Sequence, residues 1–112
     1  MAAACSASSG SEADATPSAS LQITSRSLIF DKRTLTAVAN TMVTLRFDNR
    51  DSGVPHNVAV FRDRSAEVEI FVGETFSGRA VRDYRFQTPG PGNYFFRCDT
   101  HPDTMTGTFA VR

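Results

Sequence analysis

The chemically distinctive side chains of this sequence fall into two short segments. His56 lies in the stretch GVPHNV, whereas Cys98, His101 and Met105 lie in the stretch CDTHPDTM. The chain has no other histidine, and its only other cysteine is Cys5. A thiolate, two imidazoles and a thioether form the ligand set that suits a copper ion cycling between Cu(I) and Cu(II). We therefore predict that these four residues bind one copper ion.

The spacing lets one loop supply most of this site. Cys98 follows a segment with strand character, NYFFR, and His101 falls in the turn after it. Met105 would begin the return strand. His56 must come from the start of another strand, so the metal would connect two distant parts of the fold.

Three other uses of these residues are disfavoured, and of these only a zinc site stays open. Zinc would take the same groups together with a carboxylate from Asp99 or Asp103. A nucleophilic Cys–His pair would need an exposed cysteine, but Cys98 follows a Phe-rich segment. A two-copper centre would need a second cysteine in the loop, which has one. Each residue taken alone is more often packing than ligand, so the prediction depends on all four occurring together.

The rest of the sequence predicts short strands. Segments rich in β-branched and aromatic residues alternate with polar positions, as in TMVTLRF at 41–47, and turn-forming clusters such as DNRDSG and PGPG separate them. We expect an all-β fold over residues 21–112, a Greek-key antiparallel β-sandwich of seven to eight strands. The expected core comprises Leu21, Ile23, Leu28, Ile29, Phe30, Val43, Leu45, Phe47, Val58, Val60, Phe71, Tyr84, Phe86, Tyr94, Phe96, Phe109 and Val111.

Size and charge exclude several classes of protein. With 112 residues the chain suits one domain, which we expect to be a monomer. Twelve basic and twelve acidic residues cancel, so there is no basic field for nucleic acid. No apolar run approaches the roughly 18 residues that would indicate a transmembrane segment.

The first twenty residues differ in composition from the rest. Residues 1–20 are mostly Ala, Ser and acidic residues, which predicts a disordered tail or linker. Within them, the stretch AACS resembles the end of a bacterial lipoprotein signal, whose cysteine is lipidated. That resemblance implies a lipid anchor at Cys5 and an extracytoplasmic location, in the periplasm or on the outer face of a membrane.

The motifs around the four predicted ligands resemble those of the plastocyanin–amicyanin–pseudoazurin family of cupredoxins. The matching stretches are VPHNV at 54–58, PGNYFFRCxxH at 91–101 and MxG at 105–107. The resemblance implies three equatorial copper ligands and a weak axial one, Met105. It also implies that Asn57 braces the ligand loop by hydrogen bonding. Three residues separate the loop histidine from Met105 here, where amicyanin-like loops have two and plastocyanin-like loops have four.

The same resemblance implies a function. The protein would be a single-electron carrier, not an enzyme, exchanging electrons with redox protein partners that dock near His101. The apolar residues expected around that histidine are Val54, Pro55, Pro89, Pro91 and Pro102. The alternative is a periplasmic protein that binds, buffers or delivers copper. As a further hypothesis, Asp99 and Asp103 would favour Cu(II) and lower the reduction potential.

Overall fold

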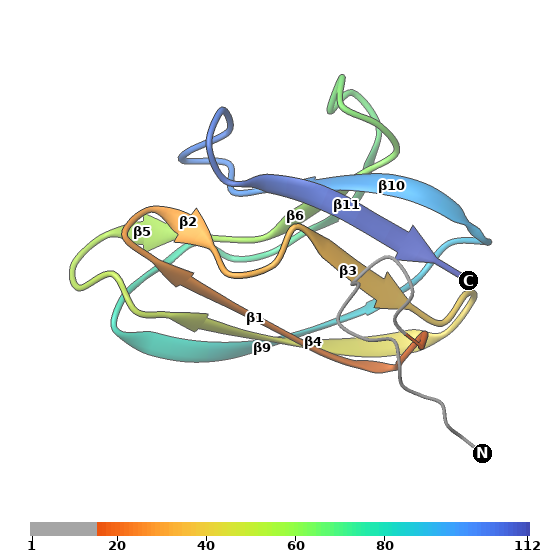
Figure 1. Ribbon diagram of the computed structural model, residues 1–112, viewed down its shortest axis with the longest axis horizontal. Coiled ribbons are helices and arrows are strands. Elements are labelled where there is room, and N and C mark those ends of the chain that lie inside the picture. The colour runs from red at the N-terminus through yellow and green to blue at the C-terminus, as the bar shows by residue number, and fades with distance from the viewer. Residues whose placement is uncertain (1–15) are drawn as a thin grey trace, which may run out of the picture.

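The computed structural model describes residues 16–112, which form two β-sheets packed face to face (Figure 1). One sheet has the strand order β2-β1-β4-β9 and the other has the order β3-β11-β10-β6-β7. Two short strands, β5 and β8, pair with each other beside them. The predicted all-β sandwich is therefore confirmed.

The described residues contain eleven strands, of which four are only two or three residues long, so the predicted number of seven to eight is close to the number of longer strands. Their bounds are β1 (Ser20–Arg26), β2 (Ile29–Phe30), β3 (Thr34–Ala37), β4 (Met42–Asn49), β5 (Pro55–His56), β6 (Ala59–Phe61), β7 (Glu69–Val72), β8 (Phe76–Ser77), β9 (Ala80–Gln87), β10 (Gly92–Arg97) and β11 (Thr106–Val111).

Two strand pairs run parallel, which corrects the expectation of a wholly antiparallel sandwich. β1 pairs with β4 in parallel, and so does β3 with β11. The reason is the path of the chain. β3 comes between β1 and β4 in the sequence but belongs to the other sheet, so the chain crosses to that sheet and returns before β4 begins. A crossover of this kind lets neighbouring strands point the same way, which a tight hairpin cannot do.

The core lies between the two sheets and follows the alternation of the sequence. On β4, Val43, Leu45 and Phe47 are fully buried. They face the other sheet, where Phe96 and Phe109 are also fully buried. Alternate positions of a strand share one face, so β4 contributes every second side chain to the core.

Two residues of the predicted core lie at the surface. Leu28 is 43% exposed and Ile29 is 57% exposed. Leu28 belongs to the turn between β1 and β2 and has a positive φ of 63°. Their apolar character indicated burial, but the turn directs them away from the core.

The beginning of the fold lies slightly earlier than predicted. β1 starts at Ser20, and the backbone of Ser18 already exchanges hydrogen bonds with Thr36 and Val38. Cys5 lies outside the described residues, so its lipidation stays a prediction of the sequence. In residues 16–112, no helix has the length and apolar character needed to span a bilayer.

A glycine just after the predicted ligand loop allows β10 and β11 to approach closely. Gly107 pairs with Phe96 across the two strands. A Cβ atom at Gly107 would lie 2.5 Å from Cε2 of the Phe96 ring and 2.6 Å from the carbonyl oxygen of Arg33. Packing therefore explains the glycine of the MxG motif, because the Phe96 ring occupies the space that a side chain at position 107 would need.

We predict that Gly107→Ala destabilises the metal-free protein by about 1–3 kcal/mol, the usual cost of overpacking a core. Gly90→Ala is the matched control, because a Cβ atom there meets no atom within 4 Å. That variant is expected to stay within about 0.5 kcal/mol of the parent, as surface substitutions usually do. Denaturant unfolding of the two variants would measure the difference, and equal stabilities would contradict the packing argument.

Candidate metal centre

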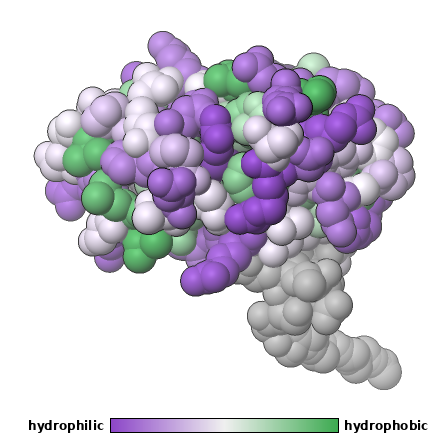
Figure 2. Space-filling model, turned by 90° about the horizontal axis from the view of Figure 1, so that it is seen from above, coloured by the Kyte–Doolittle hydropathy of each residue, from purple (hydrophilic) through white to green (hydrophobic). Residues whose placement is uncertain are grey.

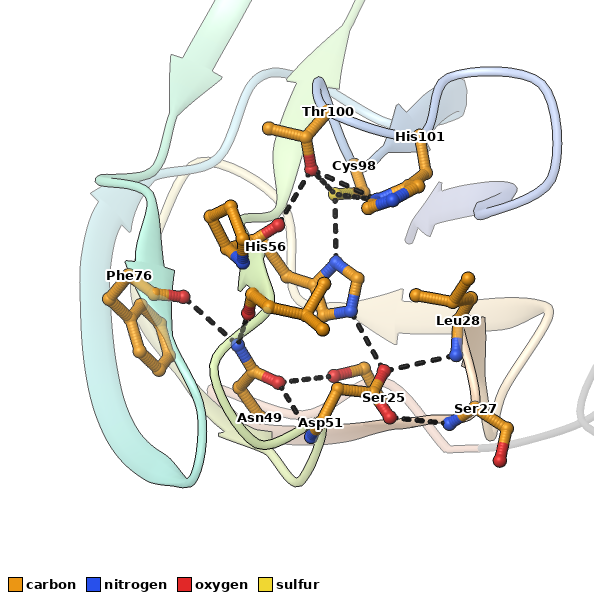
Figure 3. A network of polar contacts seen from close by, with 12 residues as sticks. Ser25, Ser27, Leu28, Asn49, Asp51, His56, Phe76, Cys98, Thr100 and His101 are labelled. Atoms are coloured by element: carbon orange, nitrogen blue, oxygen red, sulfur yellow. Dashed lines mark hydrogen bonds and ion pairs between the residues drawn. The ribbon is translucent and has the colours of Figure 1, made fainter.

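The structure brings three of the four predicted ligands together at one end of the sandwich (Figure 3). The Sγ atom of Cys98 lies 3.6 Å from Nδ1 of His56 and 3.9 Å from Nδ1 of His101. The three ligand atoms all lie within 4.8 Å of one another. Among residues 16–112, this is the one such group of metal-binding side chains, and it contains no carboxylate.

These separations fit the binding of a single ion. Metal–sulfur and metal–nitrogen bonds of about 2.3 Å and 2.0 Å, meeting at about 120°, separate the two ligand atoms by roughly 3.7 Å. The two sulfur–nitrogen distances, 3.6 Å and 3.9 Å, bracket that value. One buried thiolate with two imidazoles is also the equatorial set of a blue-copper site. The donor set and its spacing therefore both suit copper.

Backbone hydrogen bonds hold the loop from Cys98 to Met105 in a compact turn. The amide of Cys98 donates to the carbonyl of Met105 at 2.9 Å. The amide of His101 donates to the carbonyl of Cys98, and the amide of Met105 donates to the carbonyl of His101. Met105 is fully buried. The loop thus returns on itself, and three predicted ligands leave it within one turn.

His56 comes from β5, far from the loop in sequence. It pairs with Phe76 of β8 and its side chain is fully buried. Cys98 is also fully buried, whereas His101 is partly exposed. The two histidine rings meet nearly edge to face, with centroids 4.9 Å apart. Of the three grouped side chains, only that of His101 reaches the surface.

Asn57 makes the bracing contact that the resemblance implied. Its Oδ1 accepts a hydrogen bond from the amide of Asp99 at 2.8 Å, and its Nδ2 donates to the Asp99 carboxylate at 3.0 Å. Nδ2 also donates to the carbonyl of Gly73 at 2.9 Å. The residue after His56 is therefore hydrogen-bonded to the residue after Cys98, which fixes the two segments relative to each other.

The sequence analysis missed Asp51, which contacts a predicted ligand directly. Its carboxylate lies 2.8 Å from Nε2 of His56 and accepts hydrogen bonds from the amides of Ser27 and Leu28. Burial disfavours the charged carboxylate, but the amides and His56 outweigh this effect, so the pKa of Asp51 is lowered. The segment DNRDSG indicated only a turn, and no spacing rule predicts a contact five residues along the chain.

Thr100 is a second residue that the sequence analysis did not single out. Its hydroxyl donates to the carbonyl of Pro55 at 2.8 Å and lies 3.1 Å from Sγ of Cys98. It also lies 3.0 Å from Nδ1 of His101. A threonine in a turn often hydrogen-bonds to nearby backbone. That tendency was the one feature of the sequence that could have indicated a role for Thr100. Thr100 adds a second link between the loop and β5.

The two acidic residues of the loop lie outside the group of ligand atoms. Asp99 is held by Arg97, whose Nε lies 3.0 Å from its Oδ1, and by Asn57. Asp103 is exposed. Neither carboxylate belongs to the metal-binding group, so the arrangement that zinc would favour is not formed by these residues.

Two of the five apolar residues expected around His101 lie elsewhere. Pro89 and Pro91 precede β10, whereas Cys98 follows its other end. Six residues of strand separate the two ends by roughly 20 Å, at about 3.3 Å per residue. The expectation for these two prolines was wrong, because they lie in the turn that leads into β10, whereas the ligand loop follows the other end of that strand.

Comparison with known proteins agrees with the fold. A two-sheet sandwich with one cysteine and two histidines converging at its end is the arrangement of a copper-binding cupredoxin. The family model described as a cupredoxin-like domain matches residues 1–111. The chain therefore belongs to the cupredoxin-like domain family. No curated protein matches the sequence significantly.

Solved structures of similar fold are small proteins. A dithionite-reduced auracyanin from Roseiflexus castenholzii has a TM-score of 0.77 and 20% identity, covering 87% of this chain and 99% of its own. Auracyanin A, a "blue" copper protein from Chloroflexus aurantiacus, has a TM-score of 0.74 and 23% identity, and the match covers 87% of this chain and 100% of that protein. Amicyanin from Paracoccus versutus has a TM-score of 0.59 and 22% identity, and the match covers 89% of this chain and 87% of that protein. At these identities the similarity establishes the shared fold.

We predict that Met105→Leu raises the reduction potential of the copper-loaded protein while leaving its intense visible absorption in place. Leucine keeps the volume but removes the thioether, an axial donor that stabilises Cu(II). A tenfold change in relative affinity corresponds to a rise of about 59 mV. Met42→Leu is the matched control, because that side chain is 53% exposed on β4. Equal potentials in the two variants, measured by voltammetry, would exclude Met105 as a ligand.

Proposed function

We propose that this protein is a single-electron carrier with one type 1 (blue) copper ion bound by His56, Cys98, His101 and Met105. The observation that supports it most directly is the convergence of a buried thiol and two imidazole Nδ1 atoms at the spacing of a single ion. When bound, copper would supply a one-electron couple between Cu(II) and Cu(I).

The surrounding residues are arranged to hold the ligands still. His56 is anchored by strand pairing, and Cys98 is anchored by its amide hydrogen bond to Met105. Asn57 joins the two segments. Ligands fixed in this way need to move little when an electron arrives, which favours fast transfer. Because His56 and Cys98 are fully buried, water has little access and we expect no substrate turnover.

His101 would be the route by which electrons enter and leave. It is partly exposed, and Val54, Pro55 and Pro102 lie at or near the surface in the connected segments. Figure 2 shows a group of apolar side chains at the end where β2 and β5 lie in Figure 1. We propose that a redox protein docks there through a small, weak interface. A net charge of zero gives little long-range steering.

Copper buffering or delivery is the alternative function. Delivery requires a ligand exchange in which the recipient reaches the metal. Full burial of His56, Cys98 and Met105 leaves His101 as the accessible side chain of the set. This burial favours an electron carrier over a delivery protein.

We predict that the Cu(II)-loaded protein shows an intense thiolate-to-copper band in the visible region and that Cys98→Ser abolishes it. Serine lacks the sulfur donor responsible for that transition. Absorption and electron paramagnetic resonance spectra would test this, with Zn(II)-loaded protein as the colourless control. A parent protein with a pale spectrum and rapid loss of copper to a chelator would instead indicate metal handling.

We predict that Pro102→Glu slows electron self-exchange between oxidised and reduced protein by roughly tenfold. The substitution places a carboxylate in the proposed docking surface, and leaving a polar group unpaired there costs about 1–3 kcal/mol. Pro91→Glu is the control, since Pro91 is also exposed but lies before β10 at the far end. NMR line broadening measures the rate, and equal rates in both variants would place the docking surface elsewhere.

A further inference from the structure

A single carboxylate connects the first predicted ligand, His56 on β5, to the turn between β1 and β2. Asp51 follows β4, and its Oδ2 lies 2.8 Å from Nε2 of His56 (Figure 3). The same carboxylate accepts the amide of Ser27 at 2.6 Å and that of Leu28 at 3.0 Å. The Asp51 side chain is only 12% exposed, and the imidazole is fully buried.

The chemistry of this contact determines which nitrogen of His56 carries the proton. An ionised carboxylate can only accept hydrogen bonds, so Nε2 must donate. In a neutral imidazole this leaves the lone pair on Nδ1. Nδ1 is the atom that faces Sγ of Cys98, at 3.6 Å. The contact with Asp51 therefore presents His56 in the form that can bind a metal between these two atoms.

The turn that receives Asp51 has an unusual backbone. Ser27 and Leu28 have φ values of 55° and 63°, in the left-handed region that disfavours residues other than glycine. Successive amides in such a turn can point toward one anion. Here both point to the Asp51 carboxylate. Strained backbone of this kind persists where surrounding contacts determine it.

Asp51 is also fixed from its other side. Asn49 is fully buried, and its Oδ1 accepts the amide of Asp51 at 3.0 Å and the hydroxyl of Ser25 at 3.2 Å. Its Nδ2 donates to the carbonyls of Val54 and Phe76. The carboxylate therefore has a fixed position relative to β5, which carries His56.

No arginine offsets the charge of Asp51 among the ion pairs of the described residues, where His56 is its partner. The neighbouring Arg50 pairs instead with Asp48, at 3.7 Å. Asp99, on the other side of the site, differs because Arg97 pairs with it at 3.0 Å. The charge of Asp51 is thus directed at the imidazole.

We propose that Asp51 is a positioning residue that fixes His56 as the Nε2–H tautomer and whose negative charge lowers the reduction potential of the copper site. This inference rests on the proposed electron carrier. A carboxylate bonded to a ligating histidine orients the ring and raises its basicity. A more basic ligand and a nearby negative charge both stabilise Cu(II) more than Cu(I).

The first test replaces the charge and keeps the shape. In Asp51→Asn, the preference for Cu(II) over Cu(I) should fall about tenfold, which raises the potential by about 59 mV. The matched control is Asp31→Asn, which removes the same charge from the residue that directly follows β2. Asp31 accepts the amide of Thr24 and pairs with Lys32, and it contacts neither histidine. In Asp31→Asn, the relative affinity for Cu(II) over Cu(I) should change by less than about threefold, because water and salt screen the charge of this exposed carboxylate.

A purely structural role for Asp51 would lower the stability of the metal-free protein without moving the potential. Voltammetry and denaturant unfolding of both variants separate these cases. If Asp51→Asn and Asp31→Asn have the same potential, the proposed charge effect is wrong.

The second test uses the unaltered protein without metal. Nitrogen NMR should show neutral His56 with its proton on Nε2, and a proton on Nδ1 would overturn the positioning role. This measurement does not depend on whether Asp51→Asn folds. It also separates two failures, because a parent protein without the blue band refutes the electron carrier, whereas the tautomer still decides the role of Asp51.

Discussion

The candidate site depends on the hydrogen bonds between Asn57 and Asp99. Two chain segments 42 residues apart must lie side by side, because His56 and Cys98 each supply one predicted ligand atom and these two atoms are 3.6 Å apart. A single asparagine does this with both ends of its amide, accepting from the Asp99 backbone and donating to its carboxylate. Thr100 adds a parallel link to Pro55. Without such links the ligand spacing would have to be established by the metal itself, at the expense of its binding energy.

Part of this arrangement was predictable from the sequence, and the predictable part is local. Cys98, His101 and Met105 lie within eight residues, so residue type and order were enough to propose them. The alternation on β4 predicted the buried face for the same reason. The parallel pairing of β1 with β4 was not predictable, because it depends on β3 crossing to the other sheet.

The contacts of Asp51 could not be derived in the same way. They join the segment after β4 to the turn after β1 and to β5, three elements whose proximity exists only in the folded protein. Leu28 illustrates the related difficulty, since its apolar side chain indicated burial while its amide serves the carboxylate from a left-handed turn. Residue type predicted the ligands, but it could not predict which backbone groups would surround them.

The distribution of charge around the site is set by pairing, not by composition. A net charge of zero concerns solubility and long-range steering, and it gives no information on the field at one buried atom. Asp99 is offset by Arg97, whose guanidinium also stacks on Phe61 with its Cζ atom 4.7 Å from the ring centroid. Asp51 faces the imidazole of His56 and two backbone amides. Of these two carboxylates, the one without an arginine or lysine partner among the ion pairs of residues 16–112 is also the one hydrogen-bonded to a predicted ligand, which is why the proposed effect on a bound ion is assigned to Asp51.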